Sequence, residues 1–522
     1  MEKAMKLEKL SEKNLININD KKIVCYGYSQ AYLEELAQKF PQIMGNICAV
    51  YDENSSSHNT KRIENWSFPV LAKEDLTEDI LQNVVWLILS DYFGEAFDKL
   101  SSIEAIRKTS AVIYYFENYE TEIEMEYRRK YKNDCLENMI LFRSGPHASA
   151  YVKGMDFSDN ARALFEYMLA NKYNETYQLV WLVKNPEEFS HYSQYSNVYF
   201  IAYNWSLSEN IEERDAYYRA LCLSKYIFFT DAYGFARNCT QNQVRIQLWH
   251  GCGYKTRVNF VPCEKRYEYM TVISEMYANV YYKAFGLRKD QMLVTGYAKQ
   301  DWLFSPLLDV QRELELPKAD KYIFWLPTFR MAKQGLENLN QYTFNSQTGL
   351  PVVDSFDECQ ILNEMLKEKN AILVVKLHPF QDRTRIVSAE NACISDMKNI
   401  VFLDNDMLFE NDIQTNQMLR CADALISDYS SAAVDFMLLD KPIAFTLDDV
   451  EEYKESRGFF FDHIEDWLPG KKLYNFDDFF QFVKEVCEGI DSTRMIREEL
   501  MKTMHKYHDN KNCERIIAAL GI

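Results

Sequence analysis

The stretch ADALISDYSSAAVDFMLLDKP (residues 422–442) decides the expected fold. Its apolar beginning predicts a buried strand, a turn follows at Asp428–Ser431, and apolar residues then recur with helical periodicity to about Leu439. Ser430 or Ser431 is the predicted N-cap, because a hydroxyl there can accept a hydrogen bond from a free amide of the first helical turn. A strand that passes through a short turn into a helix is the building unit of a parallel α/β sheet.

The same alternation of strand and helix extends in both directions from this stretch. Strand-like segments with helical sequence between many of them are KKIVCYG (21–27), NICAVYD (46–52), NVVWLILSD (83–91), SAVIYYF (110–116), YQLVWLV (177–183), NVYFIAY (197–203), KYIFFTD (225–231), VRIQLWHG (244–251), YMTVIS (269–274), QMLVTGY (291–297), KYIFWLPTF (321–329), AILVVKLHP (371–379), NIVFLD (399–404) and KPIAFTL (441–447). We therefore expect doubly wound parallel sheets, with two lobes facing a cleft in the larger part of the chain.

Changes in composition divide the chain into four segments. Residues 1–20 are predicted to be a polar leader, and residues 21–134 a small accessory Rossmann-like α/β domain that ends in a charge-dense helix or linker. Residues 135–312 and 313–522 are predicted to be the two lobes, with the break between them near Leu303 to Pro317. The function of the accessory domain is not readable from its sequence.

Composition excludes some classes of function. The 522 residues include 59 Lys and Arg against 78 Asp and Glu, and the net charge of −19 argues against a nucleic-acid partner. No apolar run reaches the roughly 18 residues that span a bilayer, and the N-terminus lacks a signal region. The sequence therefore predicts a cytoplasmic protein, with peripheral contact at the inner face of the cell membrane left open.

Polar, reactive side chains follow the apolar strands directly. Because ligands of open parallel sheets bind beyond the carboxyl ends of the strands, these groups are expected to converge on one cleft. They are His250, Thr328, Arg330, His378, Asp428, Ser430 and Ser431.

Most of these groups suit a phosphate ligand. The helix that begins near Ser430 offers free N–H groups and a positive dipole end, and Arg330 can form a bidentate contact with phosphate. Lys376 lies two residues before His378 and so shares its face of the strand. The alternatives are a capped helix without a ligand, a histidine satisfied at a strand end, and a surface salt bridge.

His250 lies between an apolar strand and the glycine-containing loop HGCGYK. A neutral imidazole can remove a proton from an attacking hydroxyl, and Gly251 and Gly253 allow close approach of the backbone. Residues 250–299 contain eight basic and four acidic side chains, which favours an anionic acceptor or lipid. A structural histidine and a solvated mixed-charge face are the alternatives.

Six ordered motifs together resemble the CDP-glycerol glycerophosphotransferase family, the bacterial enzymes of teichoic acid and related capsule polymers. They are QLWHGCGYK, VTGYAKQDWL, WLPTFR, VVKLHP, LISDYSSAAVDFMLLDKPIAF and EEYKESRGFFFD, and GMDFSDNARALFEYM (154–168) resembles the segment that opens the acceptor lobe. The resemblance covers about residues 140–465. It implies a GT-B-like fold with two Rossmann-like lobes, which bind the acceptor on residues 135–312 and the donor nucleotide on residues 313–522.

The resemblance also implies roles for individual residues. His250 and His378 are the implied catalytic residues, with His250 as general base. The implied donor nucleotide and diphosphate set is Thr328, Arg330, Lys376, Asp428, Ser430, Ser431 and Arg457, and the acceptor-side set is Gly251, Lys255 and Arg257. The chain departs from the family where Cys252 replaces the usual Thr and Ala298 the usual Pro.

The expected reaction is transfer of an alditol phosphate, foremost glycerol phosphate, from a CDP-alditol to an acceptor hydroxyl, with release of CMP. The implied acceptor is a lipid-linked or polymeric glycan. We expect no metal site and no tightly bound cofactor, with loosely bound Mg²⁺ left open, because no carboxylate cage is evident. The alternatives are a GT-B glycosyltransferase that uses a nucleotide sugar and a catalytically silent scaffold of a polymer-assembly complex. The alditol, the distinction between primase and polymerase, and the oligomeric state stay open.

Overall fold

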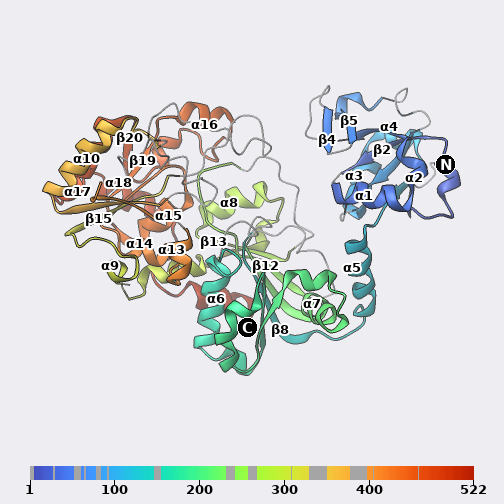
Figure 1. Ribbon diagram of the computed structural model, residues 1–522, viewed down its shortest axis with the longest axis horizontal. Coiled ribbons are helices and arrows are strands. Elements are labelled where there is room, and N and C mark those ends of the chain that lie inside the picture. Colours follow the sequence, from blue (N-terminus) through green and yellow to red (C-terminus); the bar gives the residue numbers. More distant parts are fainter. Residues whose placement is uncertain are drawn as a thin grey trace. The chain divides into compact units, whose positions relative to one another are not determined.

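The computed structural model divides into two compact units (Figure 1). Unit 1 comprises Met1–Asp134 and Asn204–Cys222, and unit 2 comprises Cys135–Tyr203 and Leu223–Ile522. The structure describes residues 5–27, 30–51, 60–63, 66–77, 81, 84–90, 93–145, 154–230, 242–256, 267–306, 309–327, 348, 350–376, 397–403, 405–456 and 458–522.

Unit 1 contains a seven-stranded sheet in the order β1-β7-β6-β2-β3-β5-β4, with β4 antiparallel to β5 and the other pairs parallel. The strands are β1 (Lys6–Lys9), β2 (Lys22–Tyr26), β3 (Ile47–Tyr51), β4 (Thr60–Ile63), β5 (Trp66–Leu71), β6 (Val84–Ile88) and β7 (Val112–Tyr115). The helices are α1 (Gln30–Lys39), α2 (Pro41–Met44), α3 (Phe93–Ser102), α4 (Glu104–Thr109) and α5 (Tyr119–Lys130). Helices pack on both faces, as a doubly wound fold requires.

The two faces of this sheet follow from residue alternation. Ile23 and Cys25 of β2 pack in one apolar cluster with α1 and α2. Val24, between them, packs in a second cluster with α3 and α4. Successive side chains of a strand point to opposite faces, so one apolar run serves two cores.

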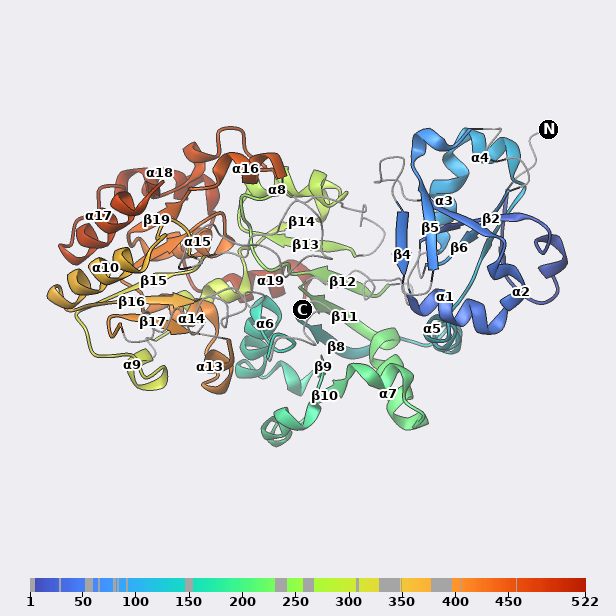
Figure 2. The same ribbon diagram turned by 45° about the horizontal axis from the view of Figure 1, so that its top comes forward.

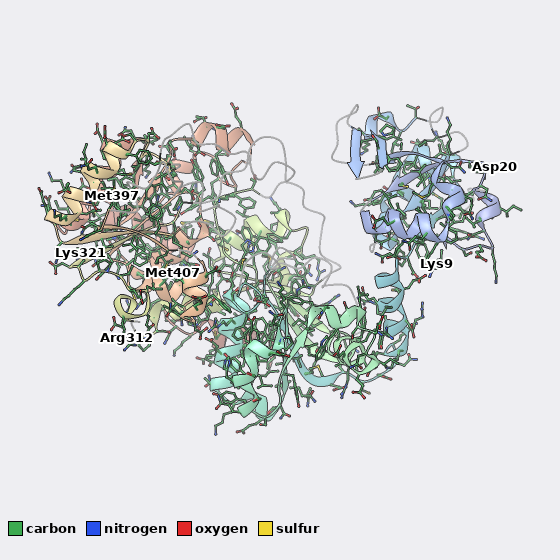
Figure 3. The ribbon with its side chains drawn as sticks, in the orientation of Figure 1. Lys9, Asp20, Arg312, Lys321, Met397 and Met407 are labelled. Carbon is green, nitrogen blue, oxygen red and sulfur yellow. The ribbon has the colours of Figure 1, made fainter. Side chains whose placement is uncertain are left out.

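Strand β1 (Lys6–Lys9) belongs to this sheet, although the sequence predicted a polar leader over residues 1–20. Strand β1 pairs in parallel with β7. Lys9 of β1, labelled in Figure 3, forms an ion pair of 2.5 Å with the buried carboxylate of Glu117. Leu10, Leu15 and Ile18 are buried in the core. The fold therefore begins earlier than Lys21, where the hydrophobic pattern placed its start, because a charged edge strand carries little apolar signal.

Helix α7 (Ile211–Leu223) lies largely within unit 1 although its sequence falls in the segment predicted for the first lobe. Tyr218 of α7 stacks on Tyr127 of α5, with ring centroids 4.5 Å apart. Asp215 accepts a hydrogen bond of 2.9 Å from the Tyr131 hydroxyl and forms an ion pair with Lys130. These contacts attach α7 to the charge-dense helix α5.

Unit 2 begins with an all-parallel seven-stranded sheet, which we call the N-lobe, in the order β10-β9-β8-β11-β12-β13-β14. Its strands are β8 (Glu137–Arg143), β9 (Gln178–Val183), β10 (Val198–Ala202), β11 (Ser224–Phe229), β12 (Val244–Gln247), β13 (Tyr269–Val272) and β14 (Met292–Val294). Helices α6 (Asp159–Ala170) and α8 (Glu275–Ala284) belong to this lobe. Strand order reverses between β8 and β11.

A second all-parallel sheet, the C-lobe, has six strands in the order β17-β16-β15-β18-β19-β20. They are β15 (Lys321–Trp325), β16 (Ala371–Lys376), β17 (Ile400–Leu403), β18 (Ala424–Ser427), β19 (Ile443–Thr446) and β20 (Lys471–Leu473). The helices are α9 (Val310–Glu313), α10 (Phe356–Glu368), α13 (Asn405–Glu410), α14 (Thr415–Arg420), α15 (Ser431–Phe436), α16 (Val450–Ser456), α17 (Phe476–Cys487) and α18 (Arg494–Met504). The strand order of the C-lobe sheet reverses between β15 and β18.

The C-terminal helix α19 (Asn512–Leu520) packs on the N-lobe (Figure 2). Cys513, Ile516 and Ile517 lie in the N-lobe core, and the Asp301 carboxylate accepts hydrogen bonds of 2.9 Å from the amides of Asn512 and Cys513. The chain thus returns from the C-lobe to the N-lobe, whereas the sequence placed residues 313–522 in one lobe. Within the described ranges, every helix is too short or too polar to cross a bilayer.

Candidate active site between the two lobes

Ser430 is the N-cap of α15, and its hydroxyl accepts a hydrogen bond of 3.3 Å from the Ala432 amide. The helical run continues from α15 through the 3₁₀ turn η12 (Met437–Leu439), so its end agrees with the predicted one. Asp428, directly after β18, is fully buried. This turn lies at the carboxyl end of β18, beside the reversal of strand order, where α/β sheets bind ligands.

Lys376 is the last residue of β16 and is buried. Strand β16 is the other neighbour of β15, so Lys376 also lies at the carboxyl edge of the sheet. An ammonium and a helix N-terminus at one edge provide positive potential for an anionic ligand.

Five predicted site residues lie outside the described part of the chain. They are Arg257, Thr328, Arg330, His378 and Arg457. Their roles stay predictions, and so does the expected meeting of the His250 and His378 rings.

On the N-lobe, the loop after β12 carries His250. Its backbone is held by Asn160 of α6, whose side-chain amide donates a hydrogen bond of 2.8 Å to the Trp249 carbonyl. The Trp249 indole lies against the imidazole, with ring centroids 3.9 Å apart. Trp249 has a φ of 55°, a strained value for a bulky residue that gives the loop its sharp turn.

The imidazole of His250 has solvent access, yet protein surrounds it closely on other sides. Desolvation and the nearby ammonium of Lys299 lower the pKa of His250 to about 4, against a hydrogen bond with the Thr230 backbone that favours the charged form. Thr230 follows β11, and its hydroxyl accepts a hydrogen bond of 3.2 Å from the Gly145 amide after β8. His250 is therefore neutral at pH 7 and lies beside the strand-order reversal of the N-lobe.

Gly251 and Ser431 bring the two lobes together. Gly251 has a φ of 150°, and a Cβ atom there would clash with the Ser431 side chain. Gly253 also approaches Ser431, but a Cβ atom on Gly253 would lie 3.6 Å away, an ordinary contact. The loop after His250 thus touches the start of α15, and the ligand-binding edges of the two sheets meet.

Lys299, in the 3₁₀ helix η9 (Ala298–Phe304), lies beneath this contact. Its Nζ atom donates a hydrogen bond of 2.6 Å to the His250 carbonyl, and lies 3.2 Å from Asp159 and 3.6 Å from Asp435. Burial by itself would lower the pKa of Lys299, but the two carboxylates outweigh it and raise the pKa above its ordinary value. Lys299 is therefore a charged ammonium that contacts residues of both lobes.

Cys252, where the family usually has Thr, is buried with its sulfur 3.1 Å from the Tyr297 hydroxyl oxygen. The Tyr281 hydroxyl accepts a hydrogen bond of 3.1 Å from the Gly253 amide. Burial raises the pKa of the Cys252 thiol to about 12, so this cysteine is no nucleophile. It serves as a small group that packs the loop against two tyrosines.

The next residues of the loop pair with the C-lobe. The Thr256 amide donates a hydrogen bond of 3.0 Å to the Gly458 carbonyl, and the Phe460 amide one of 2.8 Å to the Tyr254 carbonyl. The Lys255 ammonium lies 5.7 Å from the centroid of the Tyr453 ring. Gly251 and Lys255 thus contact the C-lobe, although the sequence placed them on the acceptor side. Their acceptor role stays a prediction.

Sequence reasoning did not single out Asp159, Asn160 or Asp435, and it counted Lys299 only as one of the basic residues of segment 250–299. Each lies inside a quoted motif, namely GMDFSDNARALFEYM, VTGYAKQDWL or LISDYSSAAVDFMLLDKPIAF. Their types are common on protein surfaces, and their partners are distant in sequence, so no local spacing distinguishes them. The only available signal was their membership in motifs that carry other predicted site residues.

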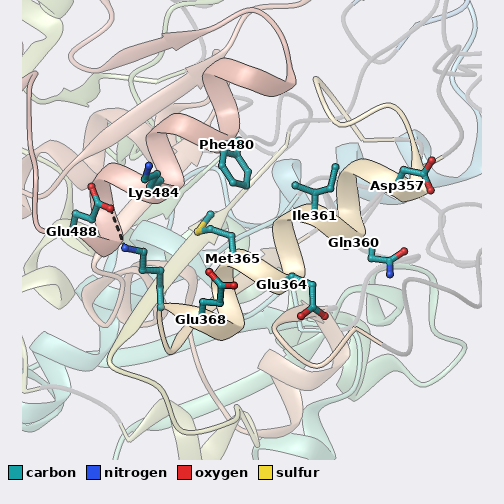
Figure 4. A pocket seen from close by; sticks show the side chains of 10 residues that line it. Asp357, Gln360, Ile361, Glu364, Met365, Glu368, Phe480, Lys484 and Glu488 are labelled. Atoms are coloured by element: carbon teal, nitrogen blue, oxygen red, sulfur yellow. Dashed lines mark hydrogen bonds and ion pairs between the residues drawn. The ribbon is translucent and has the colours of Figure 1, made fainter.

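A surface groove between α10 and α17 is lined by none of these residues (Figure 4). Ile361, Met365 and Phe480 form its apolar part, and Lys369 forms an ion pair of 3.0 Å with Glu488 at one end. None of its lining residues follows a strand of the C-lobe sheet. It is therefore distinct from the site where the lobes meet.

Two Rossmann-like lobes whose ligand-binding edges meet define a GT-B-like protein. A solved structure of a variant of the wall teichoic acid polymerase TagF has this fold, with a TM-score of 0.56, 19% identity, and coverage of 77% of this chain and 93% of that chain. The family model described as CDP-Glycerol:Poly(glycerophosphate) glycerophosphotransferase matches residues 125–520. The chain belongs to this family of enzymes, which confirms the resemblance stated above.

The curated relatives include several enzymes of teichoic acid synthesis. A teichoic acid poly(glycerol phosphate) polymerase of Bacillus spizizenii is 24% identical over 390 residues, 70% of this chain and 85% of the relative. The teichoic acid ribitol-phosphate polymerase TarK of Staphylococcus aureus is 26% identical over 345 residues, 60% of each chain. A teichoic acid glycerol-phosphate primase of Bacillus subtilis is 26% identical over 296 residues, 52% of this chain and 66% of the relative.

Proposed function

We propose that the protein transfers an alditol phosphate from a CDP-alditol to an acceptor hydroxyl in the synthesis of a teichoic acid or capsule-type polymer. The close approach of the His250 loop to the start of α15 supports this proposal, in which His250 would be the base and the start of α15 would bind the donor phosphate. Family membership supports the CDP-alditol as donor. Relatives named for glycerol phosphate and for ribitol phosphate both match, and the family model is named for glycerophosphate. Glycerol is therefore our first choice of alditol, and ribitol is the alternative.

In the proposed reaction, neutral His250 accepts the proton of the acceptor hydroxyl. The hydroxyl oxygen attacks the β-phosphorus of the donor, the bond from that phosphorus to the bridging oxygen breaks, and CMP leaves with the electron pair. The bound diphosphate places negative charge near the ring and raises the pKa of His250 toward the range in which a base is effective. Orientation of the reactants supplies much of the rate enhancement in such transfers.

The remaining predicted residues complete the proposal. Lys376, the amides after Ser430, and the undescribed residues Thr328, Arg330, His378 and Arg457 would neutralise the phosphate oxygens as charge develops. The acceptor would be a lipid-linked or polymeric glycan at the inner face of the cell membrane. The basic residues of segment 250–299 support an anionic acceptor.

The test is release of CMP from CDP-glycerol and CDP-ribitol, with short poly(glycerol phosphate) and poly(ribitol phosphate) chains as acceptors. His250→Ala should lower turnover by at least about 100-fold and leave donor binding detectable by calorimetry, because the base contributes mainly to the transition state. His191→Ala, at an exposed histidine, is the matched control and should behave as wild type. Normal turnover of His250→Ala would remove the proposed base, and release of UDP from a UDP-sugar instead of CMP would indicate a glycosyltransferase.

A further inference from the structure

Lys299 is anchored in both lobes by its backbone as well as by its side chain. Its amide donates a hydrogen bond of 3.0 Å to the Asn160 side chain in the N-lobe. Its carbonyl accepts one of 3.2 Å from the Asn416 side chain in the C-lobe. The position of Lys299 is therefore fixed by α6 on one side and by α14 on the other.

The carboxylate partners of Lys299 are also fixed. Asp435 on α15 has an almost fully buried side chain, and it accepts a hydrogen bond of 2.7 Å from the Gln300 side chain. Asp159 is the first residue of α6, directly before the Asn160 that holds the Trp249 carbonyl. One ammonium thus connects the first turn of α6, the His250 backbone and the helix that begins at Ser431.

A gain in folding stability would not by itself account for the ion pairs of Lys299 with the two carboxylates. The side chain of Lys299 is 12% exposed, and apolar residues of similar volume often replace a buried ion pair without loss of stability. The hydrogen bond to the His250 carbonyl is directed at the one residue whose imidazole is the candidate base. An ammonium there fixes the backbone of the base relative to α15.

We propose that Lys299 is a positioning residue for the transfer step, and that Asp159 and Asp435 hold its ammonium from the two lobes. The hydrogen bond to the His250 carbonyl sets the distance between the base and a donor phosphate at the start of α15. Loss of that bond lets the loop shift, and a misplacement of about 1 Å costs roughly 100-fold in rate. This inference rests on the proposed function, because it assigns the donor phosphate to α15 and the base to His250.

A second consequence concerns the charge of His250. Among the described residues, the ammonium groups of Lys299 from η9 and Lys255 from the loop itself act on the charge of His250, and Asp159 from α6 and Asp435 from α15 lie against Lys299. The Lys299 ammonium disfavours the imidazolium, so its removal raises the pKa of His250. Because the base must be neutral, the acidic limb of kcat/KM then moves to higher pH. The limb would stay in place only if the rate did not depend on the charge of His250, so the shift tests His250 as the base.

The experiment compares Lys299→Met and Lys299→Arg with wild type in the CMP-release assay with CDP-glycerol. Lys299→Met should lower kcat by about 100-fold, leave KM for CDP-glycerol within about threefold, and move the acidic limb to higher pH. Lys299→Arg keeps the charge and should recover most of the lost kcat. Lys506→Met is the matched control, since it removes a partly exposed lysine whose ion pair with Glu275 spans 2.5 Å, and it should match wild type.

Circular dichroism and thermal unfolding establish that each variant is folded. If Lys299→Met does not fold, Asp159→Asn serves in its place and should lower kcat by about tenfold at unchanged KM. A folded Lys299→Met with kcat within threefold of wild type and an unmoved acidic limb would overturn the inference and leave the proposed function intact. If wild type itself releases no CMP from CDP-glycerol or CDP-ribitol, the proposed function fails and the inference fails with it.

Discussion

Gly251 of the N-lobe and Ser431 of the C-lobe approach so closely that the first has no room for a side chain. The contact joins the loop of the candidate base to the start of the helix assigned to the donor phosphate. It exists only because two parallel sheets present their carboxyl edges to each other.

Gly251→Ala should therefore impair turnover more than it impairs stability. The added methyl group clashes with Ser431, and the backbone at this position has a φ of 150° that alanine rarely adopts. The loop must therefore move away from α15. We expect kcat with CDP-glycerol to fall by at least about tenfold. CMP release measures this effect.

Gly253→Ala is the control for that variant, because its Cβ atom would lie 3.6 Å from Ser431 and its φ is not in the left-handed region. It should retain most of the activity. Equal effects of the two substitutions would contradict the importance of the Gly251–Ser431 contact.

Cys252 should resist alkylation in the native protein. Burial raises the pKa of its thiol to about 12, so hardly any thiolate exists at pH 8 and the reagent has no access. Treatment with iodoacetamide followed by peptide mass spectrometry should label the exposed Cys135 and leave Cys252 unmodified until the protein is denatured. Rapid native labelling of Cys252 would mean that the loop opens readily.

Acidification should destabilise the protein partly through His505. The buried ring lies with its Nε2 atom 2.8 Å from the Val434 carbonyl oxygen, and burial lowers the pKa of His505 to about 4. In the unfolded state His505 binds a proton near pH 6.5, whereas in the folded state it does so only near pH 4. The contribution of the neutral buried ring to the free energy of unfolding is therefore fully present above pH 6.5 and is lost as pH falls toward 4. The pKa difference corresponds to roughly 3 kcal/mol.

His505→Gln keeps a hydrogen-bond donor but does not titrate. Urea unfolding at pH 7.5 and pH 5 should show a smaller loss of unfolding free energy for His505→Gln than for wild type. The same loss in both proteins would assign the acid sensitivity to other groups.

Arg497 should contribute far more to stability than its neighbour Arg494. The fully buried guanidinium of Arg497 lies 2.8 Å from Asp440 and 2.7 Å from Asp491. Arg497→Met removes the ion pair with Asp491 and one of the two that Asp440 forms, and should cost about 2–3 kcal/mol in unfolding free energy. Arg494 also pairs with Asp440, at 3.1 Å, but is 62% exposed, and Arg494→Met should cost at most about 1 kcal/mol. Denaturant unfolding compares the two variants, and equal costs would contradict this reasoning.

The strand order of the protein was not in the sequence pattern, but most strands were. Segments such as KYIFWLPTF and AILVVKLHP contain β15 and β16, and the GT-B-like fold class is confirmed. Strand β8 was missed because its continuous apolar run, residues 139–142, is short and flanked by polar residues. Strand β1 was missed because KLEK has no apolar periodicity and pairs only at the sheet edge.

The candidate site was predicted in part for a similar reason. His250, Ser430 and Ser431 follow apolar strands, and this local signal can be read from the sequence alone. The backbone pairing of Thr256 with Gly458 and of Tyr254 with Phe460 joins residues some two hundred positions apart, and no local signal indicates it.

By itself the sequence determined the alternation of strand and helix and the polar residues that end the strands, because hydrophobic periodicity is a property of neighbouring residues. Only the tertiary structure decided that Lys299 binds the His250 carbonyl between Asp159 and Asp435. These contacts depend on Coulomb attraction at distances of 3 to 4 Å between groups that two separate sheets bring together. Such proximity cannot be predicted from the spacing of neighbouring residues.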